Sequence, residues 1–459
     1  VVIGRDLDGI VLDGFTITGG DVEAKRPTFF GIGGGGILLE DSLNVLLANM
    51  TVRGNRARGI IGVQGGGILV WDGIHRSGDT VLTIRRSMIR NNQATLGGGL
   101  SSTFQFPAEI VIEESHILEN EQSDPDYSCL TGASGGGGLF LSGGSSLLTD
   151  VVVEMNVSDC SGGGIQDYRS LFRMQGGALL NNSVRASPAR SQDSKGGGYY
   201  AAAGGRSYMD SVLIMGNHTD YSGGAVEIFV LGYLPSANLD ITNSTIVANT
   251  ARASVLAAVT RTRLQLKNVI FWDNVAADLI WRDAPDAIID IGNSLVQGSN
   301  GSGASWNTSY GTDLGGNIDT VPSFRQPPVG TAPDVSGDFR LNLGSPAIDA
   351  GLNSAVNFAT DNDGNPRIFN NTVDMGAYET QVVCPPGGTT RLYVNDTASG
   401  TGASWADALP SLQNALTLAQ RCPSNSIDEI WVAQGTYYPD DGAYQTDGDR
   451  AASFQLQNG

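Results

Sequence analysis

The chain has 459 residues and a formal net charge of −20, from 27 basic and 47 acidic residues. The excess of acid disfavours nucleic acid and anionic membranes as partners, because both are bound through basic surfaces. Glycine accounts for 63 residues, about twice its average share. Hydrophobic residues make up 40%, enough for a large core, and no apolar run reaches the ~18 residues of a membrane-spanning helix.

Residues 1–300 repeat a run of glycines followed by apolar residues. It begins as GGGGILL at Gly33–Leu39 and continues through GGGGLFL at Gly135–Leu141. From Gly36 to Gly224, the last glycines of the first and final runs, six steps average about 31 residues. Such a run is typical of a tight corner, where a Cβ would clash or φ must be positive. The expected corner residues are Gly35, Gly66, Gly98 and Gly137.

A second marker with the same period is an alternating apolar strand that ends in asparagine. Examples are SMIRNN and STIVAN, and the 62-residue gap between Asn120 and Asn182 is counted as two repeats. Asparagine tolerates a left-handed backbone, and stacked asparagines can hydrogen-bond along an axis. The expected set is Asn55, Asn92, Asn120, Asn182, Asn217, Asn249 and Asn274.

Each repeat contains two or three short segments that alternate apolar and polar residues, the pattern of strands with one buried face. No stretch of residues 1–300 shows a helical period, and the signatures of WD40 and leucine-rich repeats are absent. The sequence therefore predicts an all-β solenoid, a parallel β-helix of about nine or more coils. Each coil would contain three short strands and stack ~4.8 Å from the next.

Four segments resemble a bacterial family. They are VLDGFTITGG at Val11–Gly20, the glycine and asparagine repeats that follow, a closing phrase at Asp338–Gly351 and Asp361–Glu379, and an opening phrase at Arg391–Ala419. Together they resemble right-handed parallel β-helix surface proteins of the choice-of-anchor Q type. The repeats are also similar to those of polymorphic outer-membrane proteins. The resemblance implies a right-handed β-helix on a cell surface.

The resemblance divides the chain into a coil array at 1–300, a closing segment at 301–383, a linker at 384–390 and an opening segment at 391–459. Because an opening segment follows a closing one, 391–459 is expected to start a second β-helix copy of a tandem array. Leu409, Leu412, Leu416 and Ala419 recur at helical spacing, which predicts a short capping helix in this segment. A separate small α/β domain is the open alternative.

The four cysteines lie at wide spacing without a C-x-x-C pair, so a zinc site is disfavoured. An even count permits two disulfides. The simplest pairing is Cys129 with Cys160 and Cys384 with Cys422, and the sequence leaves other pairings open.

The residues that carry catalysis in other parallel β-helices are not found together. The galacturonase phrases NTD, DD, GHG and RIK do not occur as a set, and His75, His116 and His218 lie in different repeats. We therefore expect no catalytic residues and no enzymatic activity.

One segment offers alternating oxygen ligands of the kind that calcium prefers. Asp361, Asp363 and Asn365 resemble the first half of a calcium loop. The alternative is an Asx turn before Pro366. No cofactor is expected, with calcium as the open alternative.

Nearly all informative residues specify the coil and few specify a site. The expected function is a non-enzymatic extracellular structural or adhesive protein, the tandem building block of a bacterial cell-surface fibre, filament or sheath. The expected partners are other copies, packed head-to-tail. Surface glycans are the open alternative, because exposed aromatic residues such as Trp281 and Trp306 can stack on sugars. The alternative is a carbohydrate-active β-helix enzyme of the polysaccharide lyase or glycoside hydrolase type. It would need a cleft with three or more convergent carboxylates and an arginine.

Overall fold

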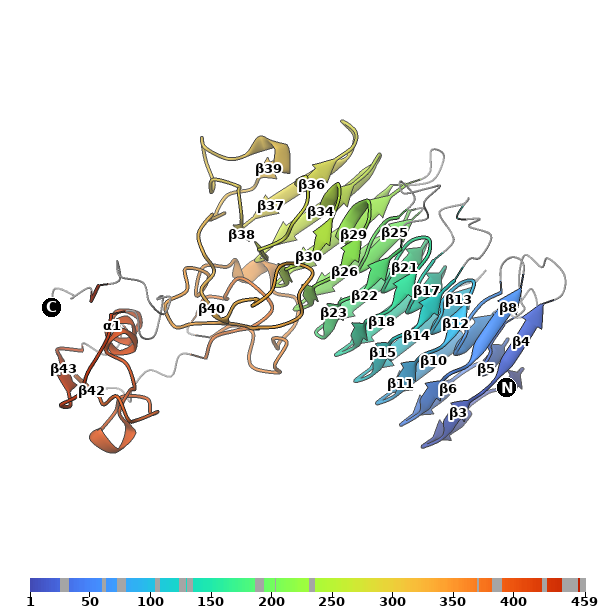
Figure 1. Ribbon diagram of the computed structural model, residues 1–459, viewed down its shortest axis with the longest axis horizontal. Coiled ribbons are helices and arrows are strands. Elements are labelled where there is room, and N and C mark those ends of the chain that lie inside the picture. Colours follow the sequence, from blue (N-terminus) through green and yellow to red (C-terminus); the bar gives the residue numbers. More distant parts are fainter. Residues whose placement is uncertain are drawn as a thin grey trace.

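A computed structural model describes residues 1–24, 33–59, 63–71, 80–103, 108–123, 129, 135–185, 194–202, 204–230, 236–369, 371–381, 390–422, 427–439 and 453–454. Four long sheets, parallel throughout, run side by side along one axis from the N-terminal coil toward residue 300 (Figure 1). The predicted all-β parallel β-helix is confirmed.

The first sheet follows the glycine corners. Its strands are β1 (Val2–Arg5), β5 (Ile37–Glu40), β9 (Ile68–Trp71), β13 (Leu100–Thr103), β17 (Leu139–Ser142), β21 (Ile165–Tyr168), β25 (Tyr199–Ala202), β29 (Ser222–Phe229), β33 (Ser254–Ala258) and β36 (Asp278–Arg282).

The second sheet contains the longer alternating strands. They are β2 (Val11–Asp13), β6 (Val45–Ala48), β10 (Thr80–Arg85), β14 (Ala108–Glu113), β18 (Ser145–Thr149), β22 (Leu171–Gln175), β26 (Arg206–Asp210), β30 (Ala237–Thr242), β34 (Thr262–Lys267), β37 (Ile288–Gly292) and β39 (Thr312–Asp313).

The third sheet precedes the asparagine markers. Its strands are β3 (Thr16–Thr18), β7 (Thr51–Arg53), β11 (Met88–Arg90), β15 (His116–Leu118), β19 (Val152–Glu154), β23 (Ala178–Leu180), β27 (Leu213–Met215), β31 (Thr245–Val247), β35 (Ile270–Trp272) and β38 (Leu295–Val296).

A fourth sheet of very short strands corrects the expectation of three strands per coil. It is formed by β4 (Asp21–Ala24), β8 (Arg56–Gly59), β12 (Gln93–Ala94), β16 (Glu121–Gln122), β20 (Val157–Ser158), β24 (Ser183–Val184), β28 (His218–Thr219) and β32 (Thr250–Ala251). Most of these strands span two residues, too few to show an alternating pattern in the sequence.

The interior is a set of aliphatic columns, because equivalent residues of successive coils pair in register. Leu47, Ile84, Ile112, Leu148 and Met174 align one above another in the second sheet, and each is at most 1% exposed. Full burial of such a side chain is worth about 1.5–3 kcal/mol. The columns therefore hold the coils together.

The interior continues into residues 306–310, beyond the last long strands. Trp306 and Tyr310, which ends η2 (Thr308–Tyr310), belong to the main core and are 7% and 8% exposed. The Trp306 Nε1–H donates to the carbonyl of Gly311 at 2.9 Å. The expectation that Trp306 is exposed and available to sugars was wrong.

The closing segment continues the coils as far as Ile318, which still pairs with Leu295 in parallel, and its later part packs on the outer face of the third sheet. It contains the antiparallel strands β40 (Phe324–Gln326) and β41 (Asp338–Leu341) and the short helix η3 (Asn353–Ala355). Its buried Phe324, Phe339 and Met375 lie in one hydrophobic cluster with Met215 and Ile270 of the solenoid.

The predicted short helix of the opening segment is present as α1 (Leu412–Arg421), which Ser411 caps by accepting from the Asn414 amide. The segment also contains β42 (Arg391–Val394), η4 (Trp405–Asp407) and β43 (Glu429–Val432), and β42 pairs with β43 in parallel. Leu418 of the helix is buried with Leu392 of β42 in a small core. No helix in the described ranges is long and apolar enough to cross a membrane.

Candidate functional sites

The marker asparagines form a buried ladder along the solenoid. The backbone N–H and the Nδ2–H of one asparagine both donate to the Oδ1 of the asparagine in the next coil, at 2.9–3.1 Å. Each Nδ2 also donates to a carbonyl of the preceding coil. The members are Asn55, Asn92, Asn120, Asn156, Asn182, Asn217, Asn249 and Asn274.

Asn156 fills the step that the sequence markers left empty between Asn120 and Asn182. We expected the asparagine itself to adopt the left-handed conformation, but the residue before it does so instead, for example Met155 with a φ of 51°. The ladder asparagine is thereby free to point its amide inward along the axis.

The predicted glycine corners stack in one column. The amide of Gly35 donates to the carbonyl of Gly65 at 3.0 Å, and the amide of Gly66 donates to the carbonyl of Gly97 at 3.2 Å. A Cβ on Gly66 would lie 2.5 Å from the carbonyl oxygens of both Gln93 and Gly98. Gly98 and Gly137 occupy the same place in the following coils, with equally close backbone oxygens. At this column the backbone of the next coil leaves no room for a Cβ.

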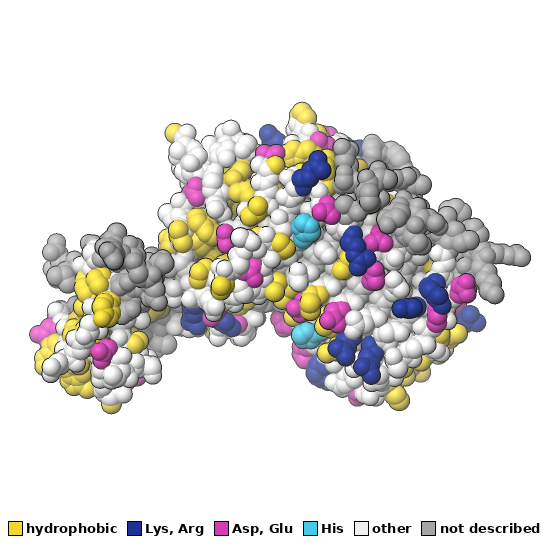
Figure 2. All heavy atoms as spheres, viewed as in Figure 1, with side chains coloured by type: hydrophobic (Ala, Val, Ile, Leu, Met, Phe, Trp, Pro, Cys, Tyr) yellow, Lys and Arg dark blue, Asp and Glu magenta, His cyan; other side chains and the backbone are white. Residues whose placement is uncertain are grey.

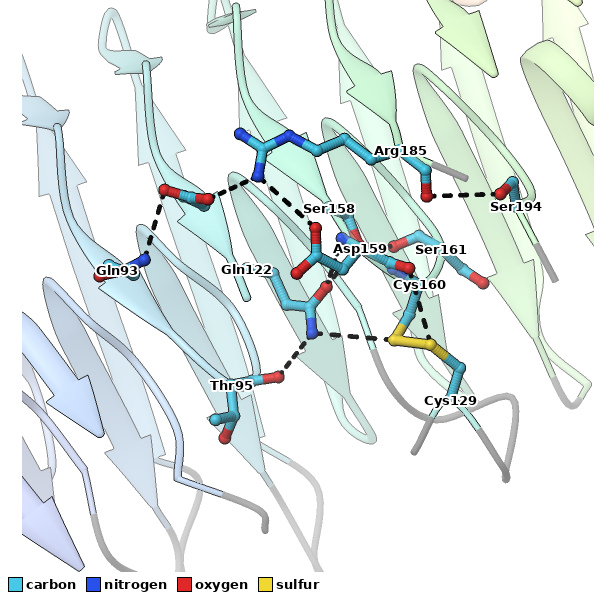
Figure 3. Close-up of polar contacts among 11 residues, drawn as sticks. Gln93, Thr95, Gln122, Cys129, Ser158, Asp159, Cys160, Ser161, Arg185 and Ser194 are labelled. Carbon is cyan, nitrogen blue, oxygen red and sulfur yellow. Dashed lines mark hydrogen bonds and ion pairs between the residues drawn. A yellow bond between two sulfur atoms is a disulfide. The ribbon is translucent and has the colours of Figure 1, made fainter. Parts of the chain in front are cut away.

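A disulfide and a set of polar contacts hold the corner between the fourth and first sheets (Figure 3). Cys129 and Cys160 are bonded, with an S–S distance of 2.14 Å and a Cα–Cα distance of 5.4 Å. The Gln122 amide beside them donates to the Thr95 carbonyl at 2.9 Å and accepts from Ser158 Oγ at 2.7 Å.

Arg185 joins three coils at the same corner by pairing with Glu121 at 2.6 Å and Asp159 at 3.5 Å. The other expected disulfide would join Cys384 of the linker to Cys422 of the opening segment. Cys422 is fully buried and disulfide-bonded, and Cys384 lies outside the described residues.

The predicted calcium ligands are engaged with protein groups. Asp361 Oδ1 accepts from the backbone amides of Asp363 and Asn365, at 3.0 and 2.7 Å, and its Oδ2 accepts from the Glu379 amide at 2.8 Å. The Asp363 carboxylate pairs instead with Arg340, at 2.6 and 2.7 Å. In the part of the chain that the structure describes, no three His, Cys, Asp or Glu side chains lie close enough to hold a metal. The contacts of Asp361 match the Asx-turn alternative, and the calcium site stays a prediction.

The closing segment contains a buried charge cluster that the sequence did not indicate. Arg367 is 1% exposed and donates through Nη2 to the carbonyls of Asp374 and Gly376. Glu379 accepts the backbone amides of Phe369 and Asp374, at 3.0 and 2.9 Å. Burial, together with the charge of Asp374, raises the pKa of Glu379 to about 8, and burial raises the pKa of Asp374 to about 6.

The raised pKa values predict that docking of the closing segment weakens as pH rises. Glu379 ordinarily titrates near 4.5, so between that value and about 8 the folded state holds more protons than the unfolded state. Stability then falls with increasing pH across this window. Hydrogen exchange of the Phe369 and Asp374 amides should be slower at pH 5 than at pH 9 after correction for intrinsic rates. Glu379→Gln should flatten this dependence, whereas the exposed Glu109→Gln should leave it unchanged.

The histidines are not brought together. His116 is exposed on β15, His218 lies 3.4 Å from Asp220, and His75 is outside the described residues. On the face shown in Figure 2, basic and acidic side chains alternate in small groups rather than gathering by sign.

A groove of about 400 Å³ lies on the outer face of the second sheet, beside η3 of the closing segment. Its floor is formed by side chains of β22, β26, β30 and β34, including Arg173, Arg206, Asp240 and Lys267. Asp210 also lines it, but its carboxylate accepts from Ser211, Thr242, Asn243 and Asn357. Sequence reasoning missed the groove because these residues come from different coils.

A smaller pocket of about 290 Å³ lies on the first sheet and contains a buried carboxyl group. Glu227 is 1% exposed, accepts from Ser222 Oγ and lies 3.9 Å from Lys195 Nζ. Burial raises its pKa. Trp281 and Asp283 complete one side of the pocket.

No known protein family matches the chain, and no curated protein sequence is significantly similar to it. The assignment therefore rests on the architecture: four parallel sheets that repeat coil by coil, an internal asparagine ladder and a glycine column. The chain has the fold of a parallel β-helix.

Proposed function

We propose that this protein is a non-enzymatic structural β-helix of a bacterial cell surface, a tandem building block similar to the choice-of-anchor Q type. The observation that carries the proposal is the uninterrupted asparagine ladder. It joins coil to coil from Asn55 to Asn274 with every side chain at most 6% exposed. A solenoid whose specific residues serve coil stacking acts as a stiff spacer.

The cysteines support an extracellular location. Cys129 is bonded to Cys160, and Cys422 is also disulfide-bonded, so the described cysteines are oxidised. Disulfides persist in oxidising compartments such as the cell surface and are rare in the cytosol.

Head-to-tail contact with other copies is supported by β43 of the opening segment, which among the described residues pairs with β42 alone. Trp431 and Val432 of β43 are 43% and 41% exposed, and Tyr438 is 57% exposed. In the first coil, Ile3 and Phe15 are each 56% exposed. A parallel strand edge with exposed apolar side chains favours pairing with another chain. Contact between two different surfaces propagates as a filament when the rotation between copies does not close a ring.

Self-association of the full chain tests the proposal. Sedimentation velocity over a concentration series should show growing assemblies, and the double variant Trp431→Asp, Val432→Asp should remain monomeric. Ile288→Asp is the matched control, since Ile288 is 45% exposed on β37, away from the opening segment. Assembly by the double variant at the level of the unmodified chain would refute the head-to-tail contact.

The alternative of a carbohydrate-active enzyme is favoured only by the groove on the second sheet. Among its described lining residues the carboxylates are Asp210 and Asp240, fewer than the three that such a site was expected to need.

A further inference from the structure

The groove on the second sheet contains three cations that have no acidic partner among the described residues. Arg173, Arg206 and Lys267 form no ion pair or side-chain hydrogen bond with any described residue. Elsewhere on the same sheet the arginines are paired, as Arg85 is with Glu113 and Arg263 is with Asp290. In a chain with 47 acidic and 27 basic residues, a group of cations within four consecutive strands is a local departure from the overall charge.

Tyr208 holds the two arginines in place. The guanidinium carbons of Arg173 and Arg206 lie 5.8 and 5.0 Å from the centre of its ring. Cation–π contact of this kind fixes a guanidinium plane while leaving its N–H donors free. The arginines are therefore arranged in advance for an anionic group, which a guanidinium binds through two parallel hydrogen bonds.

The cations are spread along the coil axis. Arg173 is on β22, Arg206 on β26 and Lys267 on β34, so the set covers three inter-strand steps of ~4.8 Å. A ligand that contacts all of them is extended and carries more than one negative charge.

Other lining groups indicate a ligand rich in hydroxyls. Asp240 and Gln265 align with Tyr208 across the sheet, and Ser354 stands on the opposite wall. Asp240 accepts hydrogen bonds, so the ligand must donate as well as present negative charge. The strands of the floor are paired on both sides, so a peptide cannot add as a further strand.

The geometry points to a binding groove for a carboxylate-bearing saccharide, with Arg173, Arg206 and Lys267 on its carboxylates and Asp240 and Gln265 on its hydroxyls. The groove volume of about 400 Å³ is typical of a small-ligand site. This binding does not depend on the proposed head-to-tail assembly, because the groove lies on the solenoid and not on the opening segment.

Isothermal titration of the full chain with tetragalacturonate at low ionic strength tests the inference. Binding should weaken with added salt, and maltotetraose, a neutral saccharide of the same length, should give no measurable heat. Arg206→Gln and Lys267→Gln should each weaken binding about tenfold or more, since each removes a charge-assisted hydrogen bond. Tyr208 stacks with Arg173 and Arg206 but not with Lys267. The Lys267 variant therefore removes a charge from the groove without removing a cation–π contact.

Arg85→Gln is the matched control, because Arg85 lies on the same sheet but outside the groove. An equal loss in this variant would show that overall charge alone governs binding. Equal affinity for maltotetraose or for tetraglutamate would overturn the saccharide assignment. Sedimentation of the same variants keeps the two proposals distinguishable. Arg206→Gln should bind the saccharide more weakly and self-associate like the unmodified chain.

Discussion

Replacing Gly163 with alanine is expected to destabilise the solenoid by at least about 3 kcal/mol or to prevent folding. The new Cβ would lie 2.5 Å from the carbonyl oxygens of both Gly197 and Ser183. Both oxygens are backbone atoms. The amide of Gly163 donates a hydrogen bond to the carbonyl of Gly196 at 3.0 Å, which fixes the spacing of the coils. Neither neighbour can move aside without separating two coils. The denaturation midpoint and the yield of folded protein measure the effect.

Gly14→Ala separates this steric effect from backbone preference. Gly14 has a φ of 78° and nothing within 4 Å of its would-be Cβ. Alanine there should cost about 1 kcal/mol from the left-handed conformation alone. Equal effects at Gly14 and Gly163 would contradict the view that the glycine column is set by close approach between coils.

The repeating part of this fold could be predicted from the sequence because its constraints recur with one period. Gly66 and Gly98 face equivalent backbone oxygens, each in the coil that follows it, so the same residue type is needed at each step. Asn92 and Asn120 likewise each donate to the Oδ1 of the asparagine in the next coil. Asn156 was missed in VVVEMN although this strand has the form of the others.

The parts that do not repeat could not be predicted in the same way. Phe324, Phe339 and Met375 contact the third sheet through an irregular chain path, and no period links them. Tyr208 and Asp240 meet in the groove because β26 and β30 pair in register, and the loops between coils differ in length. A coil-by-coil alignment of outward positions would have brought these residues together. The sequence around Glu379 does not indicate that this residue is buried, because its hydrogen-bond partners are backbone amides, which every residue type provides except proline.

The asparagine ladder gives the second large effect, since one side chain serves two neighbouring coils. Asn182 Oδ1 accepts from the backbone N–H and the Nδ2–H of Asn156, at 3.1 and 3.0 Å. Its Nδ2 donates to the Val153 carbonyl at 2.8 Å and to Asn217 Oδ1 at 3.0 Å. The residue is 0% exposed, so water cannot replace these partners. Removing the amide leaves several buried polar groups without partners.

Asn182→Ala is therefore expected to lower the free energy of unfolding by about 3–5 kcal/mol, because each buried group left unsatisfied costs about 1–3 kcal/mol. Asn182→Asp should be at least as harmful, since a carboxylate keeps the shape but places an oxygen against the acceptors Val153 O and Asn217 Oδ1. Gln175→Ala, at a half-buried amide on the outer face of β22, should change stability by less than about 1 kcal/mol. Hydrogen exchange locates the damage: the amides of Asn156 and its neighbours should lose protection first, while the first coils keep theirs, because each coil of a solenoid contacts only its neighbours. Uniform loss of protection along all coils would mean that the ladder acts as one cooperative unit and not as a series of coil-to-coil bonds.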